Sequence, residues 1–373
     1  MKAKFHEKLT VGLFCGFLTV MTVLYCALPK SGFSETEKRE LADFPEFSWE
    51  TLKTGQFGTE IETYMADHMP GRSFFVGLGA YYDLLSGRQV TKDIYVAENK
   101  RLVEAPLRWD PAQIEKNLKY IQKLADKLEM PVDLMIVPSA GYIYRDGIQN
   151  LHGEYMDDAI ISSIYQQAQT NSNLRTIPLM GHFDNHSDTF RLYYRTDHHW
   201  TSYGAYEAYA FYMESIGREP VERNAFEVEL HHGFRGSTYS RSALWLTPAE
   251  DVELWKGSDL TVTVGENTYD SPFFPDRLQE ADMYTVFLDG NQPLVRIRNE
   301  ANAGKGKLLV VRDSYANCIG PMLAESYEEV IMIDLRYYKM SASALCQAEG
   351  IDNVLVLYSL SNFMTDTNFP FLR

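Results

Sequence analysis

Continuous apolar runs separated by segments of helical periodicity dominate the chain from about residue 110 onward. Buried strands are predicted for four such runs, at residues 132–137, 308–311, 330–333 and 354–357. Helices are predicted beside them, at residues 110–128, 155–172, 202–216, 316–325 and 341–348. Strands rich in Val, Ile and Leu that alternate with helices are typical of a parallel sheet covered on both faces. The pattern therefore predicts an α/β domain, which we place at residues 86–373.

Two other regions depart from this pattern. Residues 224–298 alternate apolar and polar positions between turns such as Asp289-Gly290, which predicts a β-rich insertion carried on the α/β body. Residues 29–85 are rich in charge and turn formers, and they predict a stalk followed by a helical entry segment. Short helices are expected there at residues 60–68 and 72–85.

The N-terminal segment predicts a membrane anchor. Residues 9–28 carry no charge and are mostly apolar, and about 20 such residues span a bilayer as a helix. Lys2, Lys4 and Lys8 precede them, which predicts that residues 1–8 stay in the cytoplasm and that the rest of the chain lies outside. A cleaved signal peptide is the competing interpretation. The run is longer than a usual signal core and residues 25–29 make a poor cleavage site, so the sequence favours an uncleaved, single-pass anchor.

Composition narrows the possible partners. The chain has 373 residues and a net charge of -16, which argues against nucleic acid because little would neutralise phosphates. Cys15 and Cys26 fall in the apolar N-terminal segment, so only Cys318 and Cys346 remain for the rest of the chain. This spacing indicates neither a disulfide framework nor a metal site. Two buried free thiols are expected, with a single bridge as the alternative.

The candidate chemistry lies in two short segments. Asp197-His198-His199-Trp200 places a carboxyl and an imidazole two positions apart, and Ser314 follows the predicted strand at residues 308–311. In an extended segment, residues two apart face the same way, so Asp197 would orient His199 while His198 points to the other side. A serine just past a buried strand lies where α/β sheets bind ligands. If His199 reaches Ser314, the three residues form an acyl-transfer triad.

The surroundings of Ser314 offer further candidates. Backbone N–H groups of the next turn are available to an oxyanion, and Asn317 could add a side-chain donor. We expect Asp313 to order that turn and Trp200 to shield the imidazole from water. Additional candidates for substrate or oxyanion contacts are Arg312, Arg336 and Tyr337.

A metal site is the rival interpretation of the histidines. The histidines concerned are His182, His186, His198 and His199. His182 and His186 are expected in a loop, without the helical register that would bring them together. We therefore predict no metal and no cofactor.

The residues also resemble a known family. The segment 196–206, which contains Asp197-His198-His199-Trp200, resembles the signature of the DHHW family, and that family is similar to the SGNH-hydrolase-like domain of the alginate O-acetyltransferases. Further segments fit the same resemblance, at residues 39–42, 44–45, 55–57, 61–62, 67–68, 136–138, 234–237, 312–317 and 334–338. The resemblance covers nearly the whole chain beyond the N-terminal segment.

The resemblance implies serine-dependent acetyl transfer onto an exported polysaccharide. It assigns the acid to Asp197, the base to His199 and the nucleophile to Ser314. Such proteins typically work beside a membrane-bound O-acyltransferase that supplies acetyl groups across the bilayer. The expected function is thus an anchored, extracytoplasmic O-acetyltransferase of the cell envelope. Two alternatives stay open: a carbohydrate acetyl esterase with the same triad, and a non-catalytic scaffold of a polysaccharide export complex.

Overall fold

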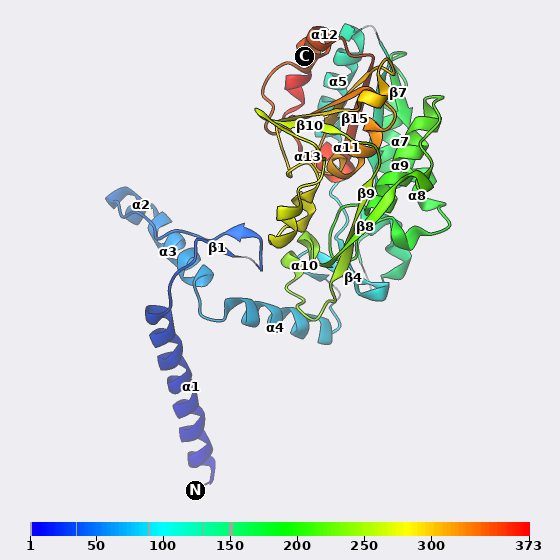
Figure 1. Ribbon diagram of the computed structural model, residues 1–373. Coiled ribbons are helices and arrows are strands. Elements are labelled where there is room, and N and C mark those ends of the chain that lie inside the picture. The colour runs from blue at the N-terminus through cyan, green and yellow to red at the C-terminus, as the bar shows by residue number, and fades with distance from the viewer. Residues whose placement is uncertain (1, 35, 89, 129, 149–151) are drawn as a thin grey trace. The chain divides into compact units, whose positions relative to one another are not determined.

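The protein consists of two compact units. The computed structural model describes residues 2–34, 36–88, 90–128, 130–148 and 152–373. One unit comprises Met1–Gly87 together with Ala243–Trp245, and the other comprises Arg88–Ser242 and Leu246–Arg373 (Figure 1). The candidate site lies entirely in the second unit.

The first unit begins with a long apolar helix, α1 (Lys2–Ala27), drawn in dark blue in Figure 1. The most apolar window of residues Phe5–Ala27 has a mean hydropathy of 2.0. No part of that window is buried inside the protein. By length and composition this helix can cross a membrane, and an N-terminal signal sequence has the same properties. It is therefore a candidate anchor or signal.

The rest of the first unit is a small hairpin and three helices. Its elements are β1 (Phe33–Ser34), β2 (Arg39–Glu40), α2 (Trp49–Thr54), α3 (Gln56–Asp67) and α4 (Arg72–Leu85). The helix predicted at residues 72–85 matches α4, and α3 begins four residues before the helix predicted at 60–68. The buried Asp67 carboxylate accepts hydrogen bonds from the Arg39 guanidinium at 2.5 and 3.0 Å and from the Ala42 N–H at 3.0 Å. These bonds join the hairpin to the end of α3.

An eight-stranded sheet forms the centre of the second unit. Its strands are ordered β11-β10-β12-β14-β13-β15-β6-β7. The consecutive strands from β14 to β7 pair in parallel, whereas β12, β10 and β11 are antiparallel additions at one side. The strand bounds are β6 (Val132–Val137), β7 (Leu174–Ile177), β10 (Thr261–Val264), β11 (Asn267–Tyr269), β12 (Leu294–Arg298), β13 (Lys307–Arg312), β14 (Glu329–Asp334) and β15 (Asn353–Ser359).

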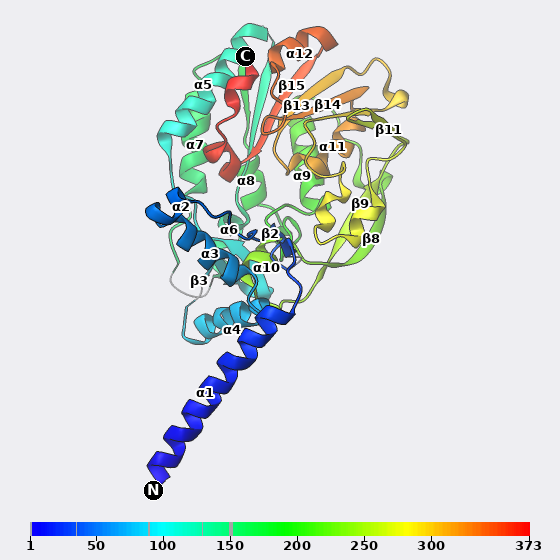
Figure 2. The ribbon, with the colours of Figure 1, turned by 90° about the vertical axis from the view of Figure 1, so that its left-hand side faces the viewer.

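Helices cover both faces of this sheet, so its strands are apolar throughout. Val310 belongs to the hydrophobic cluster on one face, and Leu309 and Val311 belong to the cluster on the other. The first cluster includes residues of α8 (Leu179–Asp184), α9 (Ser202–Ser215) and α11 (Ala316–Ala324). The second includes residues of α5 (Pro111–Leu128), α7 (Asp157–Ala168), α12 (Ala342–Glu349) and α13 (Leu360–Thr365) (Figure 2). The predicted α/β fold with a parallel-rich sheet is confirmed.

The predicted β-rich insertion divides into two parts. β8 (Glu227–Phe234) and β9 (Glu250–Lys256) form a separate antiparallel pair, whereas β10, β11 and β12 extend the central sheet. The remaining strands and α-helices are β3 (Val90–Thr91), β4 (Ile94–Ala97), β5 (Arg101–Glu104), α6 (Ala140–Ile143) and α10 (Ser237–Ser242). Strands β3, β4 and β5 form a further sheet in this unit. Cys318 and Cys346 are buried and free, as expected.

Candidate active site

Ser314 lies in the turn between β13 and α11. β13 is flanked by the parallel strands β14 and β15, so Ser314 lies at the carboxyl edge of the sheet, where ligands of open α/β sheets bind. Oδ1 of Asp313 accepts a hydrogen bond from the Tyr315 N–H at 3.0 Å. Its Oδ2 accepts from the Ser359 N–H and from Nδ2 of Asn362, both at 2.8 Å. Asp313 therefore orders the turn, as predicted.

The segment that contains the acid and the base forms a bend. An isolated antiparallel bridge between Tyr193 and Trp200 closes it, and Thr201 caps α9 by accepting from the Gly204 N–H at 3.1 Å. Trp200 is fully buried, and its Nε1–H donates to the Tyr315 carbonyl oxygen at 3.0 Å. This bond joins the bend to the turn that follows β13.

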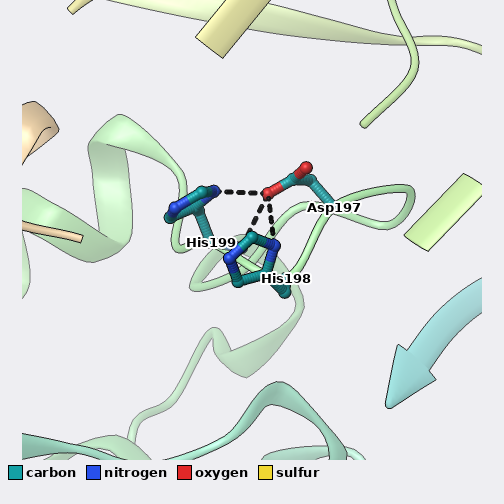
Figure 3. Close-up of side chains that lie close together, drawn as sticks. All are labelled: Asp197, His198 and His199. Atoms are coloured by element: carbon teal, nitrogen blue, oxygen red, sulfur yellow. Dashed lines mark hydrogen bonds and ion pairs between the residues drawn. The ribbon is translucent and has the colours of Figure 1, made fainter. Parts of the chain in front are cut away.

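The bend brings Asp197, His199 and Ser314 into one chain of hydrogen bonds. Nδ1 of His199 lies 2.6 Å from Oδ1 of Asp197, and its Nε2 lies 2.8 Å from Oγ of Ser314. A carboxylate only accepts, so Nδ1 carries the proton and Nε2 accepts from the serine hydroxyl. The pair formed by Asp197 and His199 is shown in Figure 3.

The prediction that His198 points away from Asp197 is wrong. The ring centroids of His198 and His199 are 3.9 Å apart, and Nδ1 of His198 lies 3.4 Å from Oδ1 of Asp197 (Figure 3). The same Nδ1 lies 2.6 Å from Oγ of Ser237. The reason is the backbone: residues 195–199 form a bend, and the two-residue alternation of an extended strand does not apply to it.

Residues 236 and 237 hold the Asp197 carboxylate from its other side. The Ser237 N–H donates to Oδ2 of Asp197 at 2.6 Å, and the His199 N–H donates to Oδ1 at 2.9 Å. A Cβ atom at Gly236 would lie 2.2 Å from Oδ2 of Asp197. Only glycine lets the backbone approach so closely, which accounts for Gly236 in the segment 234–237.

Two positioning residues were not predicted from the sequence. Glu250 accepts hydrogen bonds from the Arg195 N–H at 2.8 Å, and from both the N–H and the hydroxyl of Thr196, at 2.6 and 2.5 Å. Arg101 is buried and donates to the carbonyl oxygens of Tyr193 and Tyr194, both at 2.8 Å. Both residues fix the backbone just before Asp197. Their partners are distant in sequence, so no local pattern indicates them.

Aromatic side chains enclose the imidazole. The ring of Tyr284 stacks on His199 with a centroid distance of 3.8 Å and an interplanar angle of 7°. Trp200, expected to shield His199, lies instead against Tyr315, with centroids 5.4 Å apart. The Tyr315 hydroxyl donates to the His198 carbonyl oxygen. The stacked face of the base is thus covered by a residue from the region between β11 and β12.

Burial and neighbouring charge set the protonation of the acid and the base. Burial raises the pKa of Asp197, but the charges of His198 and His199 and the hydrogen bonds from the His199 side chain and the Ser237 N–H lower it by more, so the net pKa lies well below its usual range. The pKa of His199 is lowered, first by burial and then by His198, against the opposing effect of Asp197. At neutral pH the site therefore holds a carboxylate and a neutral imidazole, which can accept a proton.

The other side chains predicted to contact the substrate or the oxyanion pair with neighbouring residues or lie partly exposed. Arg312 is fully buried and donates to Oδ1 of Asn317 at 2.5 Å, and Nδ2 of Asn317 lies 3.3 Å from Oδ1 of Asn291. Arg336 pairs with Asp334 at 2.6 Å, and half of Tyr337 is exposed. Within the described ranges, none of these four side chains hydrogen-bonds to the Ser314 hydroxyl or to His199. Arg312 and Asn317 are joined to each other at the start of α11, and their contact with a substrate or an oxyanion stays a prediction.

The histidines considered as metal ligands fall into two groups, and each group contains a carboxylate. His182 lies in helix α8 and not in a loop, and Nε2 atoms of His182 and His186 lie 3.7 and 3.4 Å from Oε2 of Glu207. Ligand atoms of Asp197, His198 and His199 lie within 4.8 Å of one another. However, the 2.6 Å between His199 Nδ1 and Asp197 Oδ1 is shorter than the roughly 3.3 Å between ligands at a tetrahedral zinc with bonds of about 2.0–2.1 Å. This contact is a hydrogen bond.

Comparisons with known proteins agree with this fold. A DHHW family protein from Eubacterium siraeum superposes with a TM-score of 0.65 at 24% identity, covering 76% of this chain and 95% of that one. PatB1 from Bacillus cereus superposes with a TM-score of 0.62 at 21% identity, covering 74% and 99%. The O-acetyltransferase domain of AlgJ from Pseudomonas putida gives 0.49 at 14% identity, covering 75% and 95%. The first two similarities establish a shared fold.

Comparison of the sequence with family models identifies the family to which the chain belongs. A search of curated proteins found no match. The family model described as DHHW protein matches residues 114–333, which is more than half of the chain and includes Asp197, His199 and Ser314. The chain therefore belongs to the DHHW family.

Proposed function

We propose that this protein is a serine-dependent O-acetyltransferase that modifies an exported cell-surface polysaccharide, with Ser314 as nucleophile, His199 as base and Asp197 as the residue that orients it. The observation that carries the proposal is the continuous path of hydrogen bonds from Asp197 through His199 to Ser314, at 2.6 and 2.8 Å. A base aligned in this way activates a serine hydroxyl for acyl transfer. The resemblance of the DHHW family to the alginate O-acetyltransferases favours acetyl as the acyl group and a polysaccharide as the acceptor.

The proposed reaction has two halves. As Oγ of Ser314 attacks the acetyl carbonyl carbon of a donor ester, Nε2 of His199 takes the hydroxyl proton and then gives it to the departing alcohol. A sugar hydroxyl next attacks the acetyl–Ser314 ester, and His199 takes its proton and returns it to Oγ of Ser314. Asp197 stabilises the imidazolium that forms in each half. The acetyl group is thus moved from one oxygen to another without a change of oxidation state.

The proposed setting is the outer side of the cytoplasmic membrane. The apolar helix α1 supports attachment to the membrane, and the lysines before its apolar core favour a cytoplasmic N-terminus. The enzyme would then receive acetyl groups from a membrane-bound O-acyltransferase partner. Confinement to the same membrane raises the effective concentration of one partner for the other.

The test is intact-protein mass spectrometry of the full chain in detergent, incubated with a chromogenic acetyl ester. We expect the mass of one acetyl group on Ser314 in the wild type and none in Ser314→Ala. When oligosaccharide is added to the acetylated protein, the acetyl group should be transferred from Ser314 to the oligosaccharide. Release of free acetate alone would instead identify an esterase. If no adduct forms, even after co-expression with a membrane-bound O-acyltransferase, the proposal is wrong and a scaffold role replaces it.

A further inference from the structure

A pocket of about 330 Å³ lies at the carboxyl edge of β6 and β15, and its lining includes Tyr315, the residue after Ser314. Its walls come from β5, the start of α6, α10 and the start of α13. β15 is the direct neighbour of β13, which leads to Ser314, and adjacent strands are about 4.8 Å apart. The pocket therefore opens within one or two strand spacings of the nucleophile.

Residues next to the triad connect this pocket to it. Tyr315 and His198, which follow Ser314 and precede His199, both line the pocket. Two further lining residues, Ser359 and Asn362, donate to Oδ2 of Asp313 at 2.7–2.8 Å. A ligand in the pocket would contact residues that immediately flank both the nucleophile and the base.

Uncharged polar groups dominate the polar part of the lining. They comprise Ser139, Ser237, Thr238, Ser359, Ser361 and Asn362. Ser139, Ser361 and Asn362 are only partly buried, so their polar groups can reach a ligand hydroxyl. Ala105 and Leu107 are also partly buried and provide apolar surface for the C–H faces of a sugar ring.

The charges of the pocket are already paired. Glu104 and Arg241 are the charged members of the described lining, and they form an ion pair with each other. A ligand carboxylate would find the Arg241 guanidinium engaged and the Glu104 carboxylate next to it. Like charges at close range disfavour binding, and the net charge of -16 adds to this effect. A neutral ligand encounters no such repulsion.

We infer that this pocket binds the acceptor through a neutral, hydroxyl-rich pyranose unit, and that it discriminates against uronic acid units. The inference rests on the proposed function, because it assigns the acceptor class of the same site. The Glu104–Arg241 pair sets the preference, and the Ser361 hydroxyl is a contact for the sugar.

The experiment is a binding titration of the full-length Ser314→Ala protein in detergent at low salt. The ligands are cellotetraose and the β-1,4-linked tetrasaccharide of glucuronic acid, which differ only in the oxidation of C6. We expect cellotetraose to bind about tenfold more tightly or better, a difference of about 1.4 kcal/mol. Equal or tighter binding of the glucuronate, or no binding of cellotetraose, would overturn the inference.

Two variants locate the binding in this pocket. Glu104→Gln frees Arg241 and should bring the glucuronate affinity to within a few-fold of that of cellotetraose. The control Glu266→Gln removes the same charge in the exposed turn between β10 and β11, at the opposite side of the sheet, and should change nothing. Ser361→Ala should weaken cellotetraose several-fold, whereas Ser187→Ala, at an exposed position outside the pocket, should not. A thermal melt verifies that each variant is folded, and unchanged affinities in both pocket variants would refute the assignment.

The outcomes separate the two proposals. An acetyl–Ser314 adduct without a sugar preference would leave the proposed function standing and remove this inference. A sugar preference that responds to Glu104→Gln, without any adduct, would identify a sugar-binding pocket in a protein that does not transfer acetyl groups.

Discussion

The backbone N–H of Ser237 donates a 2.6 Å hydrogen bond to Oδ2 of Asp197, although the two residues lie in separate segments of the chain. Oδ1 of the same carboxylate accepts from His199, so the two oxygens have different partners. One oxygen anchors the acid to the start of α10, and the other orients the base. The position of His199 relative to Ser314 thus depends on residues 236 and 237.

Replacing Gly236 by alanine should therefore impair activity. The added Cβ would lie 2.2 Å from Oδ2 and from Cβ of Asp197, so the acid must move. A displacement of about 1 Å at such a site costs on the order of 100-fold in kcat. Acetyl transfer should fall by that amount in Gly236→Ala, while Gly181→Ala, where the added Cβ meets nothing within 4 Å, keeps its activity. Wild-type kinetics in Gly236→Ala would show that the close approach does not position Asp197.

The variant Asp197→Asn tests the orientation of the base. An asparagine that keeps the Ser237 N–H bond turns its amide N–H groups toward His199, which favours the wrong imidazole tautomer. We expect kcat for acetyl transfer to fall by about 10⁴-fold, with binding of the acceptor unchanged. Single-turnover kinetics of Ser314 acetylation measures the effect directly. A loss of tenfold or less would mean that His199 does not depend on Asp197 for its tautomer.

Glu250 should act as a positioning residue. Its carboxylate accepts from the Arg195 N–H, the Thr196 N–H and the Thr196 hydroxyl, and Glu250→Gln must replace at least one acceptor with a donor. Hydrogen bonds to a charged group contribute about 1.5–3 kcal/mol, so the bend before Asp197 should loosen. We expect kcat to fall on the order of tenfold with little change in KM. Glu227→Gln, at an exposed position of the paired strand β8, is the matched control and should behave as wild type.

The pH dependence of acetyl transfer should report the lowered pKa of His199. Only the neutral imidazole can accept the Ser314 proton, so activity is lost as pH falls through the pKa of His199. Because burial and His198 lower that pKa, the acid limb should lie below the ordinary histidine value of about 6.5. His198→Gln removes one lowering influence, so its acid limb should shift to higher pH. A limb that stays in place or moves to lower pH in this variant would contradict the assignment.

Local sequence patterns were sufficient to predict the strands that position the site residues. β6 occupies the residues predicted for it, and β13, β14 and β15 differ from their predictions by one or two residues at each end. Such strands are apolar throughout because helices cover both faces, and a continuous apolar run can be recognised from the sequence alone. The residue types at positions 197, 199 and 314 likewise indicated an acid, a base and a nucleophile before any distance was known.

The arrangement around those three residues is a property of the tertiary structure. The bend at residues 195–199 places His198 beside Asp197, against the expectation from an extended backbone, and Tyr284 rather than Trp200 stacks on His199. Glu250, Gly236 and Ser237 reach the site from the region between α9 and the end of β9. Hydrophobic periodicity and capping are short-range signals in the sequence. Contacts between distant segments produce no repeating sequence pattern, so they cannot be predicted in this way. The sequence by itself thus determined the sheet and the reactive residue types, and only packing decided how they are held.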